Sequence, residues 1–198
     1  LIFTSDHGNN FRTRNDEYKR SCHESSIRVP TSIIGNVFNQ GGRIKNLISI
    51  LDIHATILDI AKVKNYKSDG KSIVPLVMKK NIKWNDEIFI QISESQLARS
   101  LRTNKWKYCV DSPKSDPWND KHSSNYTEQF LYNLNSDPYE LNNLIGIKEF
   151  DSITKVLREK LIKNIIKHEN LKPKIKIAKK IDNPGQLGLK PGSFMDGY

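Results

Sequence analysis

The sequence has little of what marks several protein classes. Its 198 residues include only two cysteines, Cys22 and Cys109, which are too few for a disulfide framework and lack the spacing of a zinc site. A single disulfide between them is compatible with this count but is not indicated by it. No apolar run approaches the roughly 20 residues that cross a bilayer, so we expect no membrane span.

The sequence also has fewer acidic residues than basic ones. The chain carries 32 Lys and Arg against 22 Asp and Glu, a net charge of +10. A basic chain can bind nucleic acid, anionic glycans or membranes. Apart from residues 172–180, however, the lysines are spread out rather than interleaved with aromatic residues. We therefore expect no nucleic-acid partner, and attribute the charge mainly to a composition rich in Lys, Asn and Ile.

The hydrophobic pattern predicts the end of an α/β unit followed by a small antiparallel sheet and a helix. Helices are expected from Asp52, as N-cap, to Ala61 and from Asp151 or Ser152 onward. The second helix would bury one stripe of apolar side chains, namely Ile153, Val156, Leu157, Leu161 and Ile165. Strands are expected at 1–4, 27–34, 44–51, 88–92, 99–102, 106–110 and 129–134.

The first apolar run ends in Ser5-Asp6-His7-Gly8. A buried strand ending this way brings polar side chains to the carboxyl edge of an α/β sheet, where such folds place active sites. A carboxylate and an imidazole suit a divalent cation or an acid–base pair, and Gly8 would let the backbone turn behind them. A strand buried on both faces needs neighbours, and we therefore expect this chain to be the C-terminal portion of a larger protein.

Four cationic side chains follow within one short segment: Lys19, Arg20, His23 and Arg28. They could surround a sulfate or phosphate group, with lysine as a point charge and arginine as a fork. Glu24 could pair with one of them. The alternative is a solvated basic loop without a ligand.

These motifs, in this order, resemble the C-terminal half of the type I sulfatases, which belong to the alkaline phosphatase superfamily. The resemblance begins with Ser5–Gly8, Lys19 and Glu24–Pro30 and covers about residues 1–146. The later matches are the segment Leu51–Ala61, Asp69–Ser72 with Pro75-Leu76, the hairpin Leu101–Tyr108, and Leu131–Leu134 followed by Asp137-Pro138, Glu140 and Asn142–Leu144.

The resemblance implies an α/β, alkaline-phosphatase-like sulfatase fold, present in part, that ends in a small antiparallel sheet packed by a C-terminal helix. Residues 1–80 would be the C-terminal part of the catalytic domain, 81–170 the antiparallel subdomain with its closing helix, and 171–198 a loosely ordered basic tail. It also implies removal of sulfate from a sulfated carbohydrate or aryl ester by a periplasmic or secreted bacterial enzyme. The oligomeric state is not implied.

The resemblance further assigns roles to individual residues. Asp6 and His7 would be ligands of one calcium ion, and Lys19 would contact the sulfate and stabilise the leaving oxygen. His23 stands where tyrosine is commoner and would be a second contact with the substrate. Arg28 would fix the loop. The predicted substrate-binding residues are Arg20, Ser93 and Gln96.

The family's nucleophile is not found in this sequence. That nucleophile is a formylglycine made from the cysteine of a Cys-x-Pro/Ala-x-Arg motif, and neither Cys22 nor Cys109 has the Pro or Ala at +2 and the Arg at +4. We therefore expect the nucleophile upstream, and the chain by itself to be inactive. A phosphoester or phosphonate hydrolase of the same superfamily is the first alternative, and an inert or binding-only fragment is the second.

Overall fold

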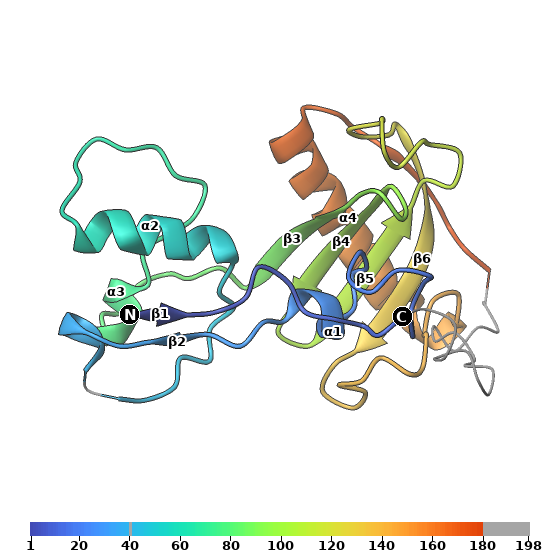
Figure 1. Cartoon of the computed structure of the whole chain (residues 1–198). Coiled ribbons are helices and arrows are strands. Elements are labelled where there is room, and N and C mark those ends of the chain that lie inside the picture. Colours follow the sequence, from blue (N-terminus) through green and yellow to red (C-terminus); the bar gives the residue numbers. More distant parts are fainter. Residues whose placement is uncertain (40, 180–198) are drawn as a thin grey trace, which may run out of the picture. The chain divides into compact units, whose positions relative to one another are not determined.

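A computed structural model describes residues 1–39 and 41–179 (Figure 1). Their contacts form two compact units. The first unit comprises Leu1–Asp6 and Val29–Ile88, and the second comprises His7–Arg28 and the described residues from Phe89 onward. Residues 7–28 therefore group with the C-terminal sheet rather than with the rest of residues 1–80, and the division differs from the expected boundaries at 80 and 170.

The first unit is small, and helices make up most of its regular structure. Its two strands, β1 (Ile2–Phe3) and β2 (Ser32–Ile33), pair antiparallel. The short helices η1 (Asn36–Phe38) and α3 (Val74–Val77) accompany the longer α2 (Ile50–Ile60). The prediction of a strand at 44–51 was wrong, because residues 44–49 have no regular structure and α2 begins at Ile50.

Two of the sulfatase-like motifs are hydrogen-bonded to each other in this unit. Ser49, not Asp52, is the N-cap of α2, and Asp52 completes the capping box by accepting from the Ser49 N–H. The other Asp52 oxygen accepts from the Lys71 N–H at 2.7 Å, and the Thr56 hydroxyl accepts from the Ile73 N–H at 2.9 Å. The spacing of these residues therefore reflects a helix N-terminus fastened to a neighbouring loop.

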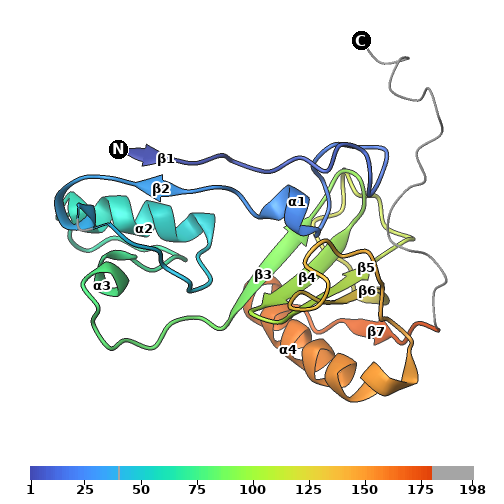
Figure 2. The ribbon, with the colours of Figure 1, turned by 90° about the horizontal axis from the view of Figure 1, so that it is seen from below.

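The second unit is built on a five-stranded sheet in the order β3-β4-β5-β6-β7 (Figures 1 and 2). The strands are β3 (Glu87–Ile92), β4 (Ala98–Thr103), β5 (Trp106–Asp111), β6 (Asn125–Asn133) and β7 (Lys174–Lys176). The β4–β5 hairpin and the β5–β6 pair are antiparallel, whereas β7 joins β6 in parallel.

The last strand was not expected from the sequence. β7 lies within the segment 171–198, which was predicted to be a loosely ordered tail. Its alternating Lys174-Ile175-Lys176 turns the middle residue toward the core cluster. Residues 180–198 of that prediction lie outside the described residues.

The helix α4 (Asp151–Glu169) packs along one face of this sheet (Figures 1 and 2). Its buried side chains Leu157, Leu161 and Ile165 follow the predicted stripe, but Val156 is 48% exposed and lies off it. The N-cap is Phe150, one residue before the expected caps. Among the described residues, no helix combines the length and the apolarity that a membrane crossing needs.

Both cysteines lie in the sheet unit as buried free thiols. Cys22 and Cys109 share an apolar cluster with Ile92 and Ala98. Burial raises the pKa of the Cys109 thiol well above its ordinary range, which disfavours the reactive thiolate. Cys22 also connects the segment 7–28 to the middle of the sheet.

Candidate active site

The segment 7–28, a loop that ends in the short helix α1 (Glu24–Ile27), carries most of the predicted site residues, and Gly8 fixes its path. The Gly8 N–H donates to the Ser26 carbonyl at 2.7 Å. A Cβ at this position would lie 2.0 Å from the Ser25 carbonyl oxygen. Glycine is therefore required by close backbone packing, and not by the sharp turn that the sequence suggested.

His7 and Lys19 are brought together in this loop. His7 Nδ1 lies 2.7 Å from the Gly8 carbonyl oxygen, which can only accept, so Nδ1 carries the proton. The lone pair is then on Nε2, which lies 3.3 Å from Lys19 Nζ. The backbone carbonyl thus selects the tautomer in which Nε2 can act as a ligand, as an outer-shell partner does in metal sites.

Asp6 ends the first unit's opening segment, directly before His7. Its side chain is exposed, and the Ser5 hydroxyl donates to Asp6 Oδ1 at 3.4 Å. No group of three or more His, Cys, Asp and Glu side chains that could hold a metal ion occurs among residues 1–39 and 41–179. The oxygen of Asp6 and the nitrogen of His7 suit a divalent cation by type, but they form at most part of a ligand set.

Arg20 is held by two acidic side chains rather than left facing an open site. Its guanidinium pairs with Glu17 at 2.5 Å and also with Glu94. It lies over the ring of Trp118, 5.3 Å from the centroid. The Ser95 hydroxyl donates to the Arg20 carbonyl at 2.6 Å, which ties this part of the loop to the sheet.

His23 is a buried residue with both ring nitrogens occupied. Its side chain is 1% exposed, with Nδ1 3.2 Å from Ser21 Oγ and Nε2 3.3 Å from Tyr132 Oη. Burial lowers the pKa of His23 from 6.5 to about 2, with the nearby Arg14 and Lys107 acting in the same direction. This geometry gives no support to a contact between His23 and the substrate, and indicates instead a neutral packing residue.

The buried neutral His23 should make folding sensitive to mild acid. Below pH 6.5 the unfolded chain gains a proton on this ring while the folded chain does not until about pH 2, so stability is lost as the pH falls. Replacing His23 by Gln should remove about 1.4 kcal/mol of the loss between pH 5.5 and 4.5, measured by urea unfolding. The matched control is His122→Gln, at an exposed ring. Equal losses in wild type and His23→Gln would contradict the expectation.

The structure separates the other two predicted substrate contacts. Ser93 is exposed and lines a pocket at the end of β3. Gln96 does not line that pocket and accepts a hydrogen bond from Gln129 at 2.9 Å. Arg28 is 76% exposed and lies 4.0 Å from Glu24, too far to fix the loop firmly.

An ion cluster that the sequence motifs did not reveal anchors the loop to the sheet. Lys107 of β5 is fully buried, and its Nζ lies 2.7 Å from Glu24 Oε1 and 2.8 Å from Glu140 Oε1. Arg102 of β4 pairs with Glu24 at 3.2 Å. The Glu24 N–H donates to Glu140 at 2.7 Å, and Arg14 donates to the Glu140 carbonyl at 2.8 Å. Three of the sulfatase-like motifs meet at this point.

The pKa values of the two carboxyl groups in the cluster are shifted in opposite directions. Burial favours a higher pKa for Glu24, but Lys107 and Arg102 outweigh it and hold the pKa below 4.5. At Glu140 burial prevails over the attraction of Lys107, and the pKa lies above its ordinary value. Glu24 is thus the firmly ionised partner that fixes Lys107, and the loop carrying His7 and Lys19 rests on this pair.

Comparison with known proteins points to one family. The sequence matches the model of the C-terminal region of N-sulphoglucosamine sulphohydrolase over residues 16–167. It is 32% identical to arylsulfatase K of Homo sapiens over 172 residues, which cover 81% of this chain and 30% of that protein. The chain thus spans about 30% of the length of the curated relatives it matches. Relatives of the same name in Gallus gallus and Xenopus laevis are also animal proteins, and give no support to the expected bacterial source.

Solved structures share the fold. A 2-O GAG sulfatase superposes with a TM-score of 0.71 at 18% identity, over 90% of this chain and 38% of that chain. A protein in complex with its substrate D-glucosamine-2-N,6-O-disulfate gives 0.64 at 20% identity, over 93% and 35%. The phosphonate monoester hydrolase of Agrobacterium radiobacter gives 0.61 at 22% identity, over 84% and 35%.

These superpositions confirm the expected partial alkaline-phosphatase-like sulfatase fold with its closing sheet and helix. The matched model covers most of the chain, including the loop with Lys19 and the strands that anchor it. The chain therefore belongs to the family of C-terminal N-sulphoglucosamine sulphohydrolase domains, and with it to the type I sulfatases.

Proposed function

We propose that this chain is the C-terminal portion of a sulfatase that removes sulfate from a sulfated carbohydrate. The observation that carries the proposal is the His7–Lys19 pair, with Lys19 Nζ 3.3 Å from His7 Nε2 on a loop fastened to the sheet. Family membership supplies the reaction class. In the whole protein, the Lys19 ammonium would bind a sulfate oxygen and stabilise the negative charge that develops on the leaving oxygen.

The proposed cofactor is one calcium ion, with Asp6 and His7 among its ligands. When bound, such an ion would neutralise charge on the transferring sulfate group. The Gly8 carbonyl holds the proton on His7 Nδ1, so the lone pair that a metal ion would use is on Nε2, the nitrogen that lies 3.3 Å from Lys19 Nζ. Further ligands and the formylglycine nucleophile would come from the upstream part of the enzyme.

The surface of the first unit supports a longer parent protein. Large apolar side chains are exposed on its strands and on α2, including Leu1 at 85%, Phe3 at 66% and Ile57 at 49%. A pocket of about 390 Å³ lies among Leu1, Ile33, Ile57 and their apolar neighbours. Apolar surface of this kind is normally covered by other protein, and the curated relatives are about three times as long as this chain.

The proposed substrate is a sulfated glycan containing an amino sugar. The matched family model takes its name from an N-sulphoglucosamine sulphohydrolase, and one structural neighbour was solved with a disulfated glucosamine. We also propose a secreted or other non-cytoplasmic location, which rests on the family alone. A phosphonate or phosphate ester hydrolase is the second candidate, because the same fold occurs in a phosphonate monoester hydrolase.

The test is a comparison of the 198-residue chain with the longer protein that contains it. With calcium present, the longer protein should release 4-nitrophenol from 4-nitrophenyl sulfate faster than from 4-nitrophenyl phenylphosphonate or 4-nitrophenyl phosphate. A chelator should abolish this activity. The chain alone should be inactive. A preference for the phosphonate ester would favour the second candidate. Turnover by the chain alone above its Lys19→Ala variant would contradict an upstream nucleophile.

A further inference from the structure

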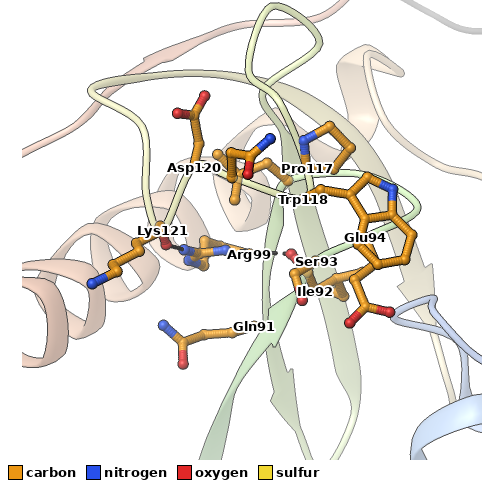
Figure 3. A pocket seen from close by; sticks show the side chains of 11 residues that line it. Gln91, Ile92, Ser93, Glu94, Arg99, Pro117, Trp118, Asp120 and Lys121 are labelled. Carbon is orange, nitrogen blue, oxygen red and sulfur yellow. Dashed lines mark hydrogen bonds between the residues drawn. The ribbon is translucent and has the colours of Figure 1, made fainter.

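A pocket of about 400 Å³ lies in the second unit, between the end of β3 and the connection from β5 to β6 (Figure 3). Gln91–Glu94 form one wall and Pro117–Lys121 the other, while Leu97 and Arg99 complete the lining. In Figure 3, Trp118 and Glu94 lie together on one side of the pocket and Lys121 on the opposite side. The lining therefore combines one large aromatic ring with amide, hydroxyl and charged groups.

Hydrogen bonds join the two walls, so the pocket has its shape without a ligand. The Glu94 N–H donates to the Pro117 carbonyl at 2.8 Å, and Glu94 adopts a left-handed backbone with φ of 70°. Asp116 Oδ1 accepts from the Trp118 N–H at 2.9 Å. Arg99 donates to the Lys121 carbonyl at 2.6 Å from the opposite side.

The charges of the lining are largely balanced within the protein. Arg99, which is 2% exposed, pairs with Glu169 at 2.5 Å and donates to the Ala98 carbonyl at 2.8 Å. Glu94 is paired with Arg20. The buried guanidinium of Arg99 is therefore already neutralised and is not available to bind a further sulfate group of the glycan. Asp120 and Lys121 add one charge of each sign to the lining, so the pocket has no net charge and is better suited to an uncharged polar ligand.

Trp118 gives the pocket its recognition surface. Its side chain is 65% exposed, and the guanidinium of Arg20 lies over the ring at 5.3 Å. An indole held at the mouth of a polar pocket offers an apolar face for stacking, while Ser93, Gln91 and Asp120 offer hydrogen-bonding groups to hydroxyls. A sugar ring has both features, an apolar C–H face and a rim of hydroxyls.

We propose that this pocket binds an unsulfated sugar ring of the glycan that carries the scissile sulfate, with Trp118 as its stacking platform. The proposal rests on the proposed function for the link to catalysis, because Arg20 joins the pocket rim to the loop and directly follows Lys19. The ring in the pocket would be a neighbour of the sulfated ring, and its contacts would select a glycan over a simple aryl sulfate.

Binding to the 198-residue chain tests the pocket without requiring turnover. Isothermal titration would use three unsulfated tetrasaccharides: the uncharged one made from N-acetylglucosamine, and those from heparosan and chondroitin, in which uncharged amino-sugar rings alternate with glucuronate. At least one should bind, and Trp118→Ala should weaken it about tenfold, the loss of one stacking contact of roughly 1.4 kcal/mol. The matched control is Tyr139→Ala, at an aromatic side chain that is 76% exposed and outside the pocket.

The outcomes separate the pocket from the proposed function. Binding that depends on Trp118 supports the pocket even if the longer protein releases no sulfate. If none of the three tetrasaccharides binds, or if Trp118→Ala binds as wild type does, the proposal is overturned while sulfatase activity stands on its own assay. Binding of a sulfated tetrasaccharide alone, lost in Lys121→Gln and kept in Trp118→Ala, would also overturn it in favour of an anion site.

Discussion

Replacing Lys107 by Met should destabilise the chain by about 3–5 kcal/mol, the cost of removing one partner from a buried ion pair. Lys107 is fully buried and lies 2.7 Å from Glu24 and 2.8 Å from Glu140. Without the ammonium, Glu24 keeps Arg102 as a partner, but Glu140 remains buried close to a second carboxylate. Urea unfolding of the 198-residue chain, followed by circular dichroism, measures the difference.

The control variant is Lys114→Met, which removes an exposed lysine from the same unit and should change stability by less than about 0.5 kcal/mol. Adding Glu140→Gln to Lys107→Met should recover part of the loss, because a neutral amide is cheaper to bury than a carboxylate. A loss below about 1 kcal/mol in Lys107→Met would show that the cluster does not hold the loop. No recovery in the double variant would show that the loss comes from packing.

If the longer protein is the proposed sulfatase, Lys19→Ala should lower its kcat by about 10²–10³-fold, equivalent to about 2.7–4 kcal/mol of lost transition-state stabilisation. Lys19 is part-buried beside His7 and approaches the ring of Tyr18 at 5.5 Å, so its ammonium is held in place before substrate binds. A positioned cation stabilises charge that develops on the leaving oxygen more than charge already present on the substrate. The loss should therefore appear in kcat more than in KM.

Steady-state kinetics with 4-nitrophenyl sulfate measure this effect, and Lys114→Ala is the control for removal of a surface charge. Lys19→Arg should recover little, because a guanidinium has a different shape from an ammonium. The unfolding midpoint of Lys19→Ala should stay close to that of wild type, which would separate a catalytic loss from misfolding. Full turnover by Lys19→Ala would remove Lys19 from the active site.

Several features of this protein follow from the sequence by itself. The order of the motifs from Ser5–Gly8 to Leu144 is sufficient to indicate the family. The β4–β5 hairpin and the buried Leu157, Leu161 and Ile165 of α4 also follow, because each depends on residues close together along the chain. The spacing of residues along the chain was therefore enough to predict these elements.

Only the tertiary structure showed how the surroundings of the four predicted cations differ. By residue type alone, four potential cations lie between residues 19 and 28, yet His23 is buried and neutral, Arg20 is paired with acids and Arg28 is exposed. Lys107, which anchors the loop, lies 83 residues from Glu24. Spacing along the chain does not reveal such a pair, because burial and charge pairing depend on which distant segments pack together. The same holds for Gly8, whose role is set by the Ser25 carbonyl across the loop.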